Sequence, residues 1–233
     1  MQGFASREND MSGHLPVPGH LTDAIRRILP RGRLAISHPA GCPGIPLYLF
    51  DPLVLEGPLS HDEAQAVVAE PAYWSFCWAS GQVLAQWILD HPDRVRGRRV
   101  LDFGSGSGVV AVAAALAGAS EAIACDLDPD ALAAAEANAA LNGVRVTLCD
   151  DWYRRPADVD LITAADVLYD RDNRPFLQQF CQAAPGVLLA DSRVRDLMEP
   201  GYQVLDLIEA TTWPDLNEFE EFNQVRLYRA GDW

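Results

Sequence analysis

Three alternating glycines follow an apolar segment in the run VLDFGSGSG at residues 100–108. A carboxylate, Asp126, ends the next apolar segment, 22 positions after Gly104. Glycine has no Cβ, so the backbone can turn tightly there and come close to a ligand. Glycines after one strand and an acid after the next predict a nucleoside-binding α/β unit.

The spacing of the glycines indicates which class of nucleoside ligand the loop binds. A dinucleotide site prefers G-x-G-x-x-G, but here the third glycine comes one position early and Val109 occupies the later position. No Gly-Lys-Ser/Thr sequence follows, which excludes a nucleoside-triphosphate loop. The early third glycine favours a ligand without phosphates that lies close across the loop.

The elements around this loop alternate between strand and helix from about Arg98, which is typical of a mostly parallel sheet. We predict strands at 98–103, 121–126, 144–149, 159–165 and 186–191, and helices near 107–117, 129–141 and 173–183. Two further extended segments, 202–210 and 221–229, are separated by about ten residues, which is too short for a helical crossover, so they should pair antiparallel. The predicted fold is a Rossmann-like, doubly wound α/β sheet of seven strands, mostly parallel with an antiparallel C-terminal strand, plus an N-terminal helical extension.

The chain divides into three predicted regions. Residues 1–20 are expected to form a disordered tail, 21–92 an N-terminal extension and lid, and 93–233 the nucleoside-binding domain. The extension is rich in proline, with helical patches near 21–29, 62–69 and 81–89, and residues 71–78 (PAYWSFCW) hold four aromatic side chains.

Composition limits the possible partners. A net charge of −15 disfavours a nucleic-acid substrate and anionic membranes. No apolar stretch approaches the ~20 residues of a membrane span. The cysteines lack C-x-x-C spacing and the histidines lack ligand spacing, so we expect reduced thiols, no metal and a cytoplasmic location.

The segment VLDFGSGSG, followed by CDLDPDALAAAEANAALNG (125–143), strongly resembles the seven-strand S-adenosylmethionine-dependent methyltransferases. WASGQVL (78–84) and DVLY (166–169) resemble the non-histone protein lysine methyltransferases with a D-x-x-Y motif. The nearest named group is the electron-transfer-flavoprotein β-subunit lysine methyltransferases, some of whose bacterial members are labelled predicted nicotinamide N-methyltransferase. The resemblance runs from about 71 to 191.

This resemblance implies S-adenosylmethionine as cofactor and S-adenosylhomocysteine as product. The backbone at Gly104, Ser105 and Gly106 should contact the methionine part, and Asp102 should orient the loop or reach the amino group. Asp126 should accept hydrogen bonds from both ribose hydroxyls.

The adenine should lie where the third strand ends. Asp150 can accept from its exocyclic amine and Trp152 offers a flat apolar face; the alternative is a capped loop with a core tryptophan. Leu127 and Trp78 complete the predicted pocket.

Asp166 and Tyr169 lie at the carboxyl end of the fourth strand and, by resemblance, mark the acceptor side; the alternative is a buried cap and a core tyrosine. We expect Asp166 to direct a hydrogen bond rather than to act as a strong base, and to border the cofactor as well. Tyr169, Trp74 or Trp213 can supply an aromatic wall for a cationic amine.

The expected function is N-methylation of lysine side chains in a protein with a basic patch, with the electron-transfer-flavoprotein β subunit as the specific candidate. A small-molecule amine or nicotinamide-type N-methyltransferase is the alternative. A nicotinamide-dependent oxidoreductase and a catalytically silent binding module are the remaining hypotheses.

Overall fold

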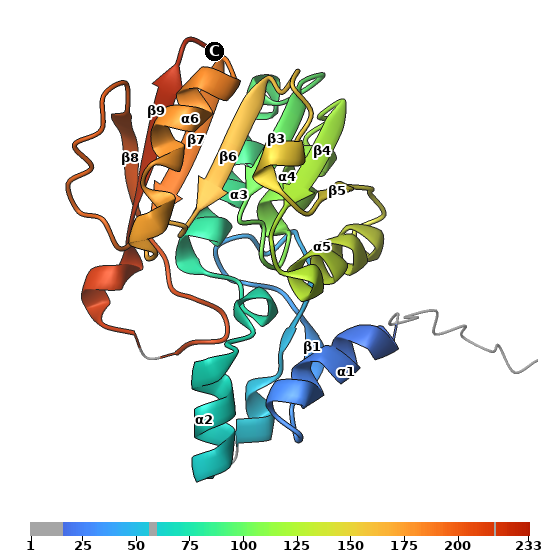
Figure 1. Ribbon diagram of the computed structural model, residues 1–233. Helices are drawn as coiled ribbons and strands as arrows, with labels where there is room; N and C mark the ends of the chain where they lie inside the picture. Colours follow the sequence, from blue (N-terminus) through green and yellow to red (C-terminus); the bar gives the residue numbers. More distant parts are fainter. Residues whose placement is uncertain (1–15, 56–59, 217) are drawn as a thin grey trace, which may run out of the picture.

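A computed structural model describes residues 16–55, 60–216 and 218–233. Its main feature is a seven-stranded sheet with the order β5-β4-β3-β6-β7-β9-β8 (Figure 1). The strands are β3 (Arg99–Phe103), β4 (Glu121–Cys125), β5 (Thr147–Cys149), β6 (Leu161–Ala165), β7 (Gly186–Asp191), β8 (Gln203–Glu209) and β9 (Gln224–Gly231). Each lies within a few residues of its predicted position.

Strands β3 to β7 run parallel, whereas β9 pairs antiparallel with both β7 and β8. The predicted fold class and the antiparallel C-terminal pairing are therefore confirmed. The chain starts in the middle of the sheet at β3, adds β4 and β5 on one side, and then crosses to β6 on the other. The carboxyl ends of β3 and β6 consequently meet at a topological switch point, where open α/β sheets bind ligands.

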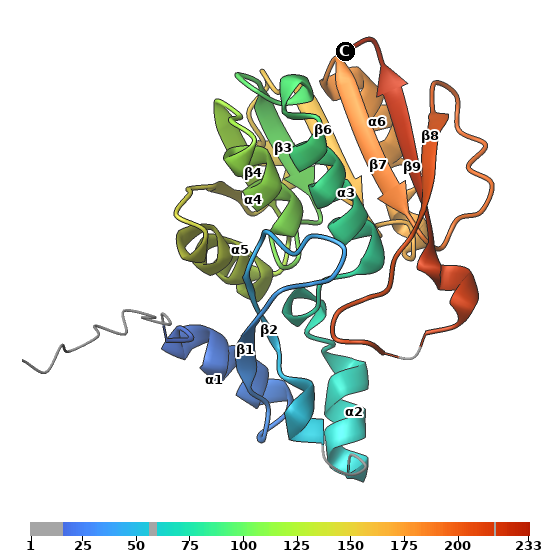
Figure 2. The same cartoon turned by 180° about the vertical axis from the view of Figure 1, so that it is seen from behind.

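Helices cover both faces of the sheet (Figures 1 and 2). Those that pack on the sheet are α3 (Ala79–Asp90), α4 (Val109–Leu116), α5 (Pro129–Leu141) and α6 (Phe176–Ala183), whereas α1 (Gly19–Ile28) and α2 (His61–Ala69) belong to the N-terminal segment. Short 3-10 turns in the described ranges cover Pro52–Leu55, Tyr73–Ser75, Pro92–Arg94, Trp152–Arg154, Arg171–Asn173 and Glu220–Asn223. Helix α6 packs on one face, and α3 and α4 pack on the other, so the central strands are buried on both sides.

The two ends of helix α5 are determined by residues next to them in the sequence, so its bounds could be predicted. The Asp128 side chain accepts from the backbone N–H of Asp130 at 2.8 Å, which caps the helix, and Pro129 occupies its first position, where no N–H is needed. At the other end Gly143 takes a left-handed conformation with φ 69°. The observed bounds are those predicted.

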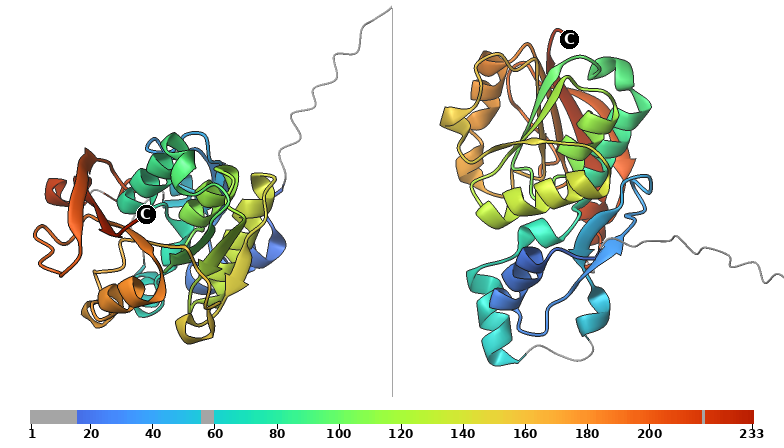
Figure 3. Two further views of the ribbon diagram at one scale, coloured as in Figure 1. Left: turned by 90° about the horizontal axis from the view of Figure 1, so that it is seen from above. Right: turned by 90° about the vertical axis from the view of Figure 1, so that its right-hand side faces the viewer.

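The N-terminal segment lies below the carboxyl ends of the parallel strands (Figure 3). It contains, besides α1 and α2, an antiparallel hairpin of β1 (Leu34–Ser37) and β2 (Leu47–Phe50), which the prediction of a proline-rich extension with helical patches did not include. Its own apolar cluster, which includes Leu21, Tyr48 and Trp74, packs against Ala131 and Ala134 of α5.

The predicted tail also needs correction. Residues 1–15 lie outside the described part of the chain, but α1 begins at Gly19, inside the range expected to be disordered. Leu21, the first residue of the predicted extension, is fully buried in the cluster on α5, and α1 matches the helical patch expected near 21–29.

Helix α3 falls inside the predicted extension yet packs on the sheet. Its buried side chains Val83, Leu84 and Ile88 join one apolar cluster with Leu188 of β7 and Val225 of β9. The helix therefore connects the N-terminal segment to the sheet, with its first turn at the carboxyl edge where the site lies.

Candidate functional site

A cavity of about 600 Å³ opens at the carboxyl edge of β3, β4 and β6. It holds eight of the eleven predicted site residues. These are Trp78, Gly104, Gly106, Asp126, Leu127, Trp152, Asp166 and Tyr169. Asp102, Ser105 and Asp150 lie outside the cavity wall, and each is treated below.

The glycine loop turns directly after β3. Gly104 and Gly106 both have positive φ, 66° and 50°, which L side chains rarely adopt. A Cβ on Gly106 would meet no protein atom within 4 Å, so this glycine keeps the cavity open. A Cβ on Gly108 would lie 2.6 Å from the Cα of Ala135, so the third glycine serves the packing of α5.

Asp126 connects the two strand ends. Its Oδ2 accepts from the backbone N–H of Gly106 at 2.9 Å, and its Oδ1 accepts from that of Asp128 at 3.0 Å. A carboxylate oxygen can accept two hydrogen bonds, so each oxygen keeps one site for a diol. Burial raises the pKa of Asp126, while the two backbone donors oppose that shift.

Asp102 lies behind the loop rather than on the cavity wall. Its Oδ1 accepts from the Thr163 hydroxyl at 2.9 Å, and burial raises the pKa of Asp102 to about 7. The position suits an orienting role for the loop better than direct contact with a ligand. Ser105 is also buried, and its hydroxyl has no hydrogen-bond partner among the described residues.

The adenine end differs from the prediction by one residue. Asp151, not Asp150, lines the cavity; its side chain accepts from the backbone N–H of Tyr153 at 2.9 Å and starts a 3-10 turn. Asp150 is exposed and pairs with Arg154 at 3.0 Å. The turn after β5 decides which of two neighbouring acids faces inward.

Trp152 is buried in an aromatic cluster beneath this end of the cavity. Its ring lies edge-on to Phe103 and Phe180, and its indole N–H donates to Gln179 at 3.0 Å. The guanidinium of Arg155 lies 3.7 Å from the ring centroid. Trp152 is therefore a core residue that also lines the cavity, and its contact with an adenine stays a prediction.

Asp166 is buried and hydrogen-bonded on both oxygens. It accepts from the hydroxyl and backbone N–H of Ser80, at 2.6 and 3.0 Å, and from those of Ser192, at 2.8 and 3.2 Å. Ser80 lies in the first turn of α3, so Asp166 satisfies donors that a helix end leaves unpaired. Its φ of 51° is the only positive value for a non-glycine residue in the described ranges.

Aromatic side chains form the rim on the acceptor side. The ring of Tyr73 lies 5.6 Å from that of Tyr169 and 5.8 Å from that of Trp78. Tyr73 and Tyr169 are 46% and 59% exposed, and burial of the remainder raises the pKa of Tyr169. Trp74 also lines the cavity, whereas Trp213 does not.

Several wall residues were not predicted from the sequence. They are Tyr73, Phe103, Cys125, Asp128, Ala131, Asp151, Tyr153, Ala165, Val167, Asp170, Asn173, Phe176 and Arg193. Tyr73 belongs to the aromatic run at residues 71–78, which the sequence analysis singles out. For the other wall residues, no local sequence signal indicates that they line a common cavity. Arg193 pairs with Glu218, and its backbone N–H donates to Asp191, whose pKa burial raises to about 6.

Three further features concern metal binding, disulfides and membrane spans. Across residues 16–55, 60–216 and 218–233, no cluster of three or more histidine, cysteine or acidic side chains has an arrangement that could hold a metal ion. The cysteines are all free thiols. Within the same ranges no helix has the length and apolar character needed to cross a bilayer.

Comparisons with known proteins all find methyltransferases. A family model described as ribosomal protein L11 methyltransferase (PrmA) matches residues 84–169. The electron transfer flavoprotein beta subunit lysine methyltransferase of Rattus norvegicus is 43% identical over 103 residues, which are 43% of this chain and 40% of that protein. The chain thus spans less than half the length of this curated relative.

Solved structures share the fold at lower identity. Ribosomal protein L11 methylase from Lactobacillus delbrueckii subsp. bulgaricus is 23% identical with a TM-score of 0.51, over 66% of this chain and 79% of that one. Magnesium protoporphyrin IX methyltransferase (ChlM) from Synechocystis PCC 6803, with bound SAH, is 15% identical with a TM-score of 0.50, over 75% and 89%. The resemblance inferred from the sequence is confirmed, and the fold is that of these methyltransferases.

Proposed function

We propose that this protein is an S-adenosylmethionine-dependent N-methyltransferase that methylates lysine side chains of a protein, with the electron-transfer-flavoprotein β subunit as the specific substrate. The observation that carries the proposal is the meeting of Gly104, Gly106 and Asp126 in one cavity at the switch point of the sheet. The similarity to lysine methyltransferases of that flavoprotein subunit supports the choice of substrate.

The cavity has the features that S-adenosylmethionine requires. Its volume of about 600 Å³ lies within the range of small-molecule sites. Gly106 leaves space that a Cβ would fill, Asp126 offers acceptors to a ribose diol, and the buried Ser105 hydroxyl lacks a described partner. The bound cofactor would supply a methyl group activated by an adjacent sulfonium.

Different residues would contact the different parts of the cofactor. Gly104 and Gly106 would hold the methionine part, Asp126 the ribose, and Leu127 with Trp152 the adenine. Asp102 would fix the loop from behind through its bond to Thr163.

The aromatic rim suits a cationic acceptor. Tyr73, Trp78 and Tyr169 offer ring faces at the mouth, where cation–π contact is worth roughly 0.5–2 kcal/mol. Asp128 and Asp170 also line the cavity and add negative charge to it. Because Tyr73 and Tyr169 are about half exposed, a side chain that projects from a protein can reach their exposed ring surfaces.

The acceptor amine must lose its proton before it can attack. A lysine with a pKa near ~10.4 is presented neutral at pH 7 at a cost of roughly 4–5 kcal/mol. Burial among the rim aromatics lowers that cost, while nearby carboxylates raise it. Asp166 accepts four hydrogen bonds already, so we assign it to positioning of the acceptor loop and of Trp78, and assign Tyr169 to contact with the acceptor.

We propose a cytoplasmic location for the reaction, which the free cysteines support. The net charge of −15 supports a basic patch on the partner, because it favours association with positive surfaces.

The test uses the purified protein with radiolabelled S-adenosylmethionine and purified electron-transfer flavoprotein. We expect label on the β subunit, located on lysine by mass spectrometry, and none with the Asp126→Ala variant. Label only in dialysable amines, tested with nicotinamide, would favour the small-molecule function instead. No transfer to either class, with S-adenosylhomocysteine still bound, would indicate a silent binding module.

A further inference from the structure

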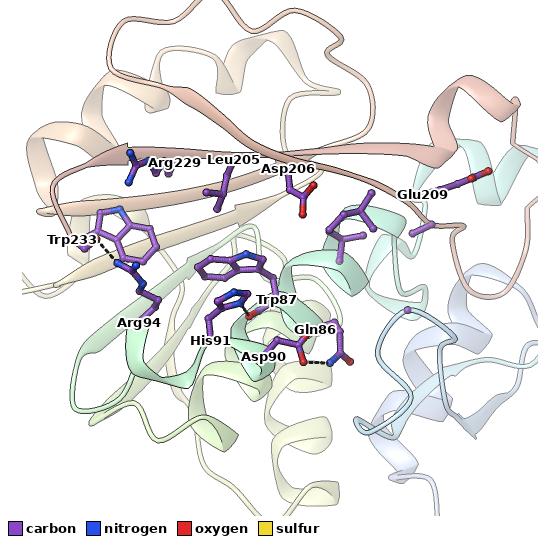
Figure 4. Close-up of a pocket in the computed structure, with 14 residues that line it drawn as sticks. Gln86, Trp87, Asp90, His91, Arg94, Leu205, Asp206, Glu209, Arg229 and Trp233 are labelled. Carbon is purple, nitrogen blue, oxygen red and sulfur yellow. Dashed lines mark hydrogen bonds between the residues drawn. The ribbon is translucent and has the colours of Figure 1, made fainter.

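A second groove lies between α3 and β8, away from the cofactor cavity, with a volume of about 500 Å³ (Figure 4). Side chains from the last turns of α3, from β8 and from the C-terminal residue line it. Figure 4 shows Leu205 and Asp206 of β8 facing Trp87 of α3. None of the residues assigned to methyl transfer takes part.

One wall of the groove is an uncovered edge strand. Within the described ranges β8 pairs only with β9, so its other edge leaves backbone donors and acceptors unpaired. Leu205, which lines the groove, is 40% exposed, and Val204 and Leu207 on the same strand are 63% and 54% exposed. The connection from β7, residues 192–202, contains no helix that could cover them.

The opposite wall is aromatic. The ring of Trp87 stacks on His91 at 4.3 Å and lies edge-on to Trp233 at 6.3 Å. Arg94 fixes this arrangement, because its guanidinium donates to the Trp233 carbonyl at 2.9 Å and lies over the Trp233 ring. The result is a flat apolar surface beside the strand, suited to the stem or plane of a long side chain.

The charges of the groove are asymmetric. Asp90, Asp206 and Glu209 line it, and no ion pair joins any of them to a described residue. The two arginines are already engaged: Arg94 as above, and Arg229 with the side-chain oxygen of Gln203 at 3.4 Å. With three carboxylates and two guanidinium groups the groove keeps a net negative charge, which favours a cation. Arginine suits the site best, since its planar head stacks on aromatic rings.

We propose that the α3–β8 groove binds an extended, basic segment of a partner protein. The free edge of β8 offers main-chain hydrogen bonds to an extended chain, as in strand addition. Long basic side chains of that segment would reach Asp206 and Glu209, which lie three positions apart on β8, and apolar ones would cover Leu205 and Trp87. The proposal goes beyond methyl transfer, because neither cofactor nor acceptor lysine is needed for binding.

The test is fluorescence anisotropy of a fluorescein-labelled octapeptide, (Arg-Val)4, with the full-length protein and no cofactor. We expect saturable binding that Asp206→Asn with Glu209→Gln weakens by about three- to tenfold, from two partly exposed ion pairs. Both side chains are exposed, so the double variant should fold, and an unchanged melting temperature checks this. The peptide (Glu-Val)4 should not bind.

The matched control is Asp23→Asn with Glu136→Gln, which removes the same charges from exposed positions on α1 and α5. It should bind like wild type. Equal binding by the wild type and the groove variant would overturn the proposal, as would equal weakening by the control, which would indicate non-specific attraction to an acidic protein. Self-association in sedimentation that the groove variant abolishes would also overturn it, because a second copy would then be the occupant.

Discussion

Replacement of Asp126 by asparagine tests the ribose contact directly. The carboxylate accepts from the backbone N–H groups of Gly106 and Asp128, and its remaining acceptor sites are those assigned to the two ribose hydroxyls. Asparagine has nearly the same shape but one acceptor oxygen and one NH2 group. Its NH2 must therefore face either the Gly106 N–H or a ribose hydroxyl that needs an acceptor.

The expected loss follows from that mismatch. A hydrogen bond to a charged group contributes about 1.5–3 kcal/mol, and every 1.4 kcal/mol is a factor of ten in affinity. We therefore expect S-adenosylhomocysteine to bind roughly 10- to 100-fold more weakly to Asp126→Asn. The free protein should not lose stability to the same degree, because burial raises the pKa of Asp126 and thus disfavours its charge in the folded state.

Isothermal titration calorimetry with S-adenosylhomocysteine measures the difference. Asp150→Asn is the matched control: it makes the same chemical change at an exposed residue outside the cavity, and it should bind within twofold of wild type. Wild-type affinity in Asp126→Asn would refute the ribose assignment. A large loss in Asp150→Asn would instead support the adenine contact that the sequence predicts for Asp150.

Three further changes give distinct expected results. Gly108→Ala places a Cβ 2.6 Å from Ala135 at a φ of 77°, so we expect the unfolding free energy to fall by about 2–3 kcal/mol in urea titration; wild-type stability would contradict the packing role. Asp102 has its pKa raised to about 7, so the folded protein retains a proton that the unfolded chain releases, and stability falls as pH rises from about 4 to 7. Asp102→Asn should accordingly raise the melting temperature relative to wild type at pH 8 but not at pH 4, and an equal change at both would count against the shift. Tyr169→Ala should reduce methyl transfer by about tenfold, through loss of a cation–π contact, with cofactor affinity and melting temperature unchanged. Weakened cofactor binding in calorimetry would show that Tyr169 contacts the cofactor and not the acceptor.

The sequence predicted those parts of the fold that local signals determine. Strand β7 and helix α5 appear with the predicted bounds, since a proline and capping acid start α5 and a glycine ends it. Asp126 was identified because it follows directly from a strand end at a fixed distance from the glycines. In each case the deciding interactions lie within a few residues of one another.

Non-local contacts explain what the sequence did not predict. The hairpin β1–β2 consists of four-residue strands in a proline-rich segment, and packing against α5 decides its formation. The bonds between Asp166 and Ser80 join residues 86 positions apart. Neither residue type nor spacing indicates such a pair, and the same holds for the meeting of Tyr73 with Tyr169.

The two ends of the D-x-x-Y segment (166–169) differ in what they do: Asp166 holds the start of α3 by hydrogen bonds, and Tyr169 lines the cavity. At φ 51° the backbone of Asp166 turns so that its carboxylate faces Ser80 and Ser192, and Tyr169 lies at the mouth of the cavity. A strained residue persists only where its surroundings over-determine it, and four hydrogen bonds do so here. Loss of methyl transfer in Asp166→Ala would therefore not by itself identify a chemical role. Helix α3 starts at the same bonds, directly after Trp78, so the carboxylate sets the position of the acceptor rim before any acceptor arrives.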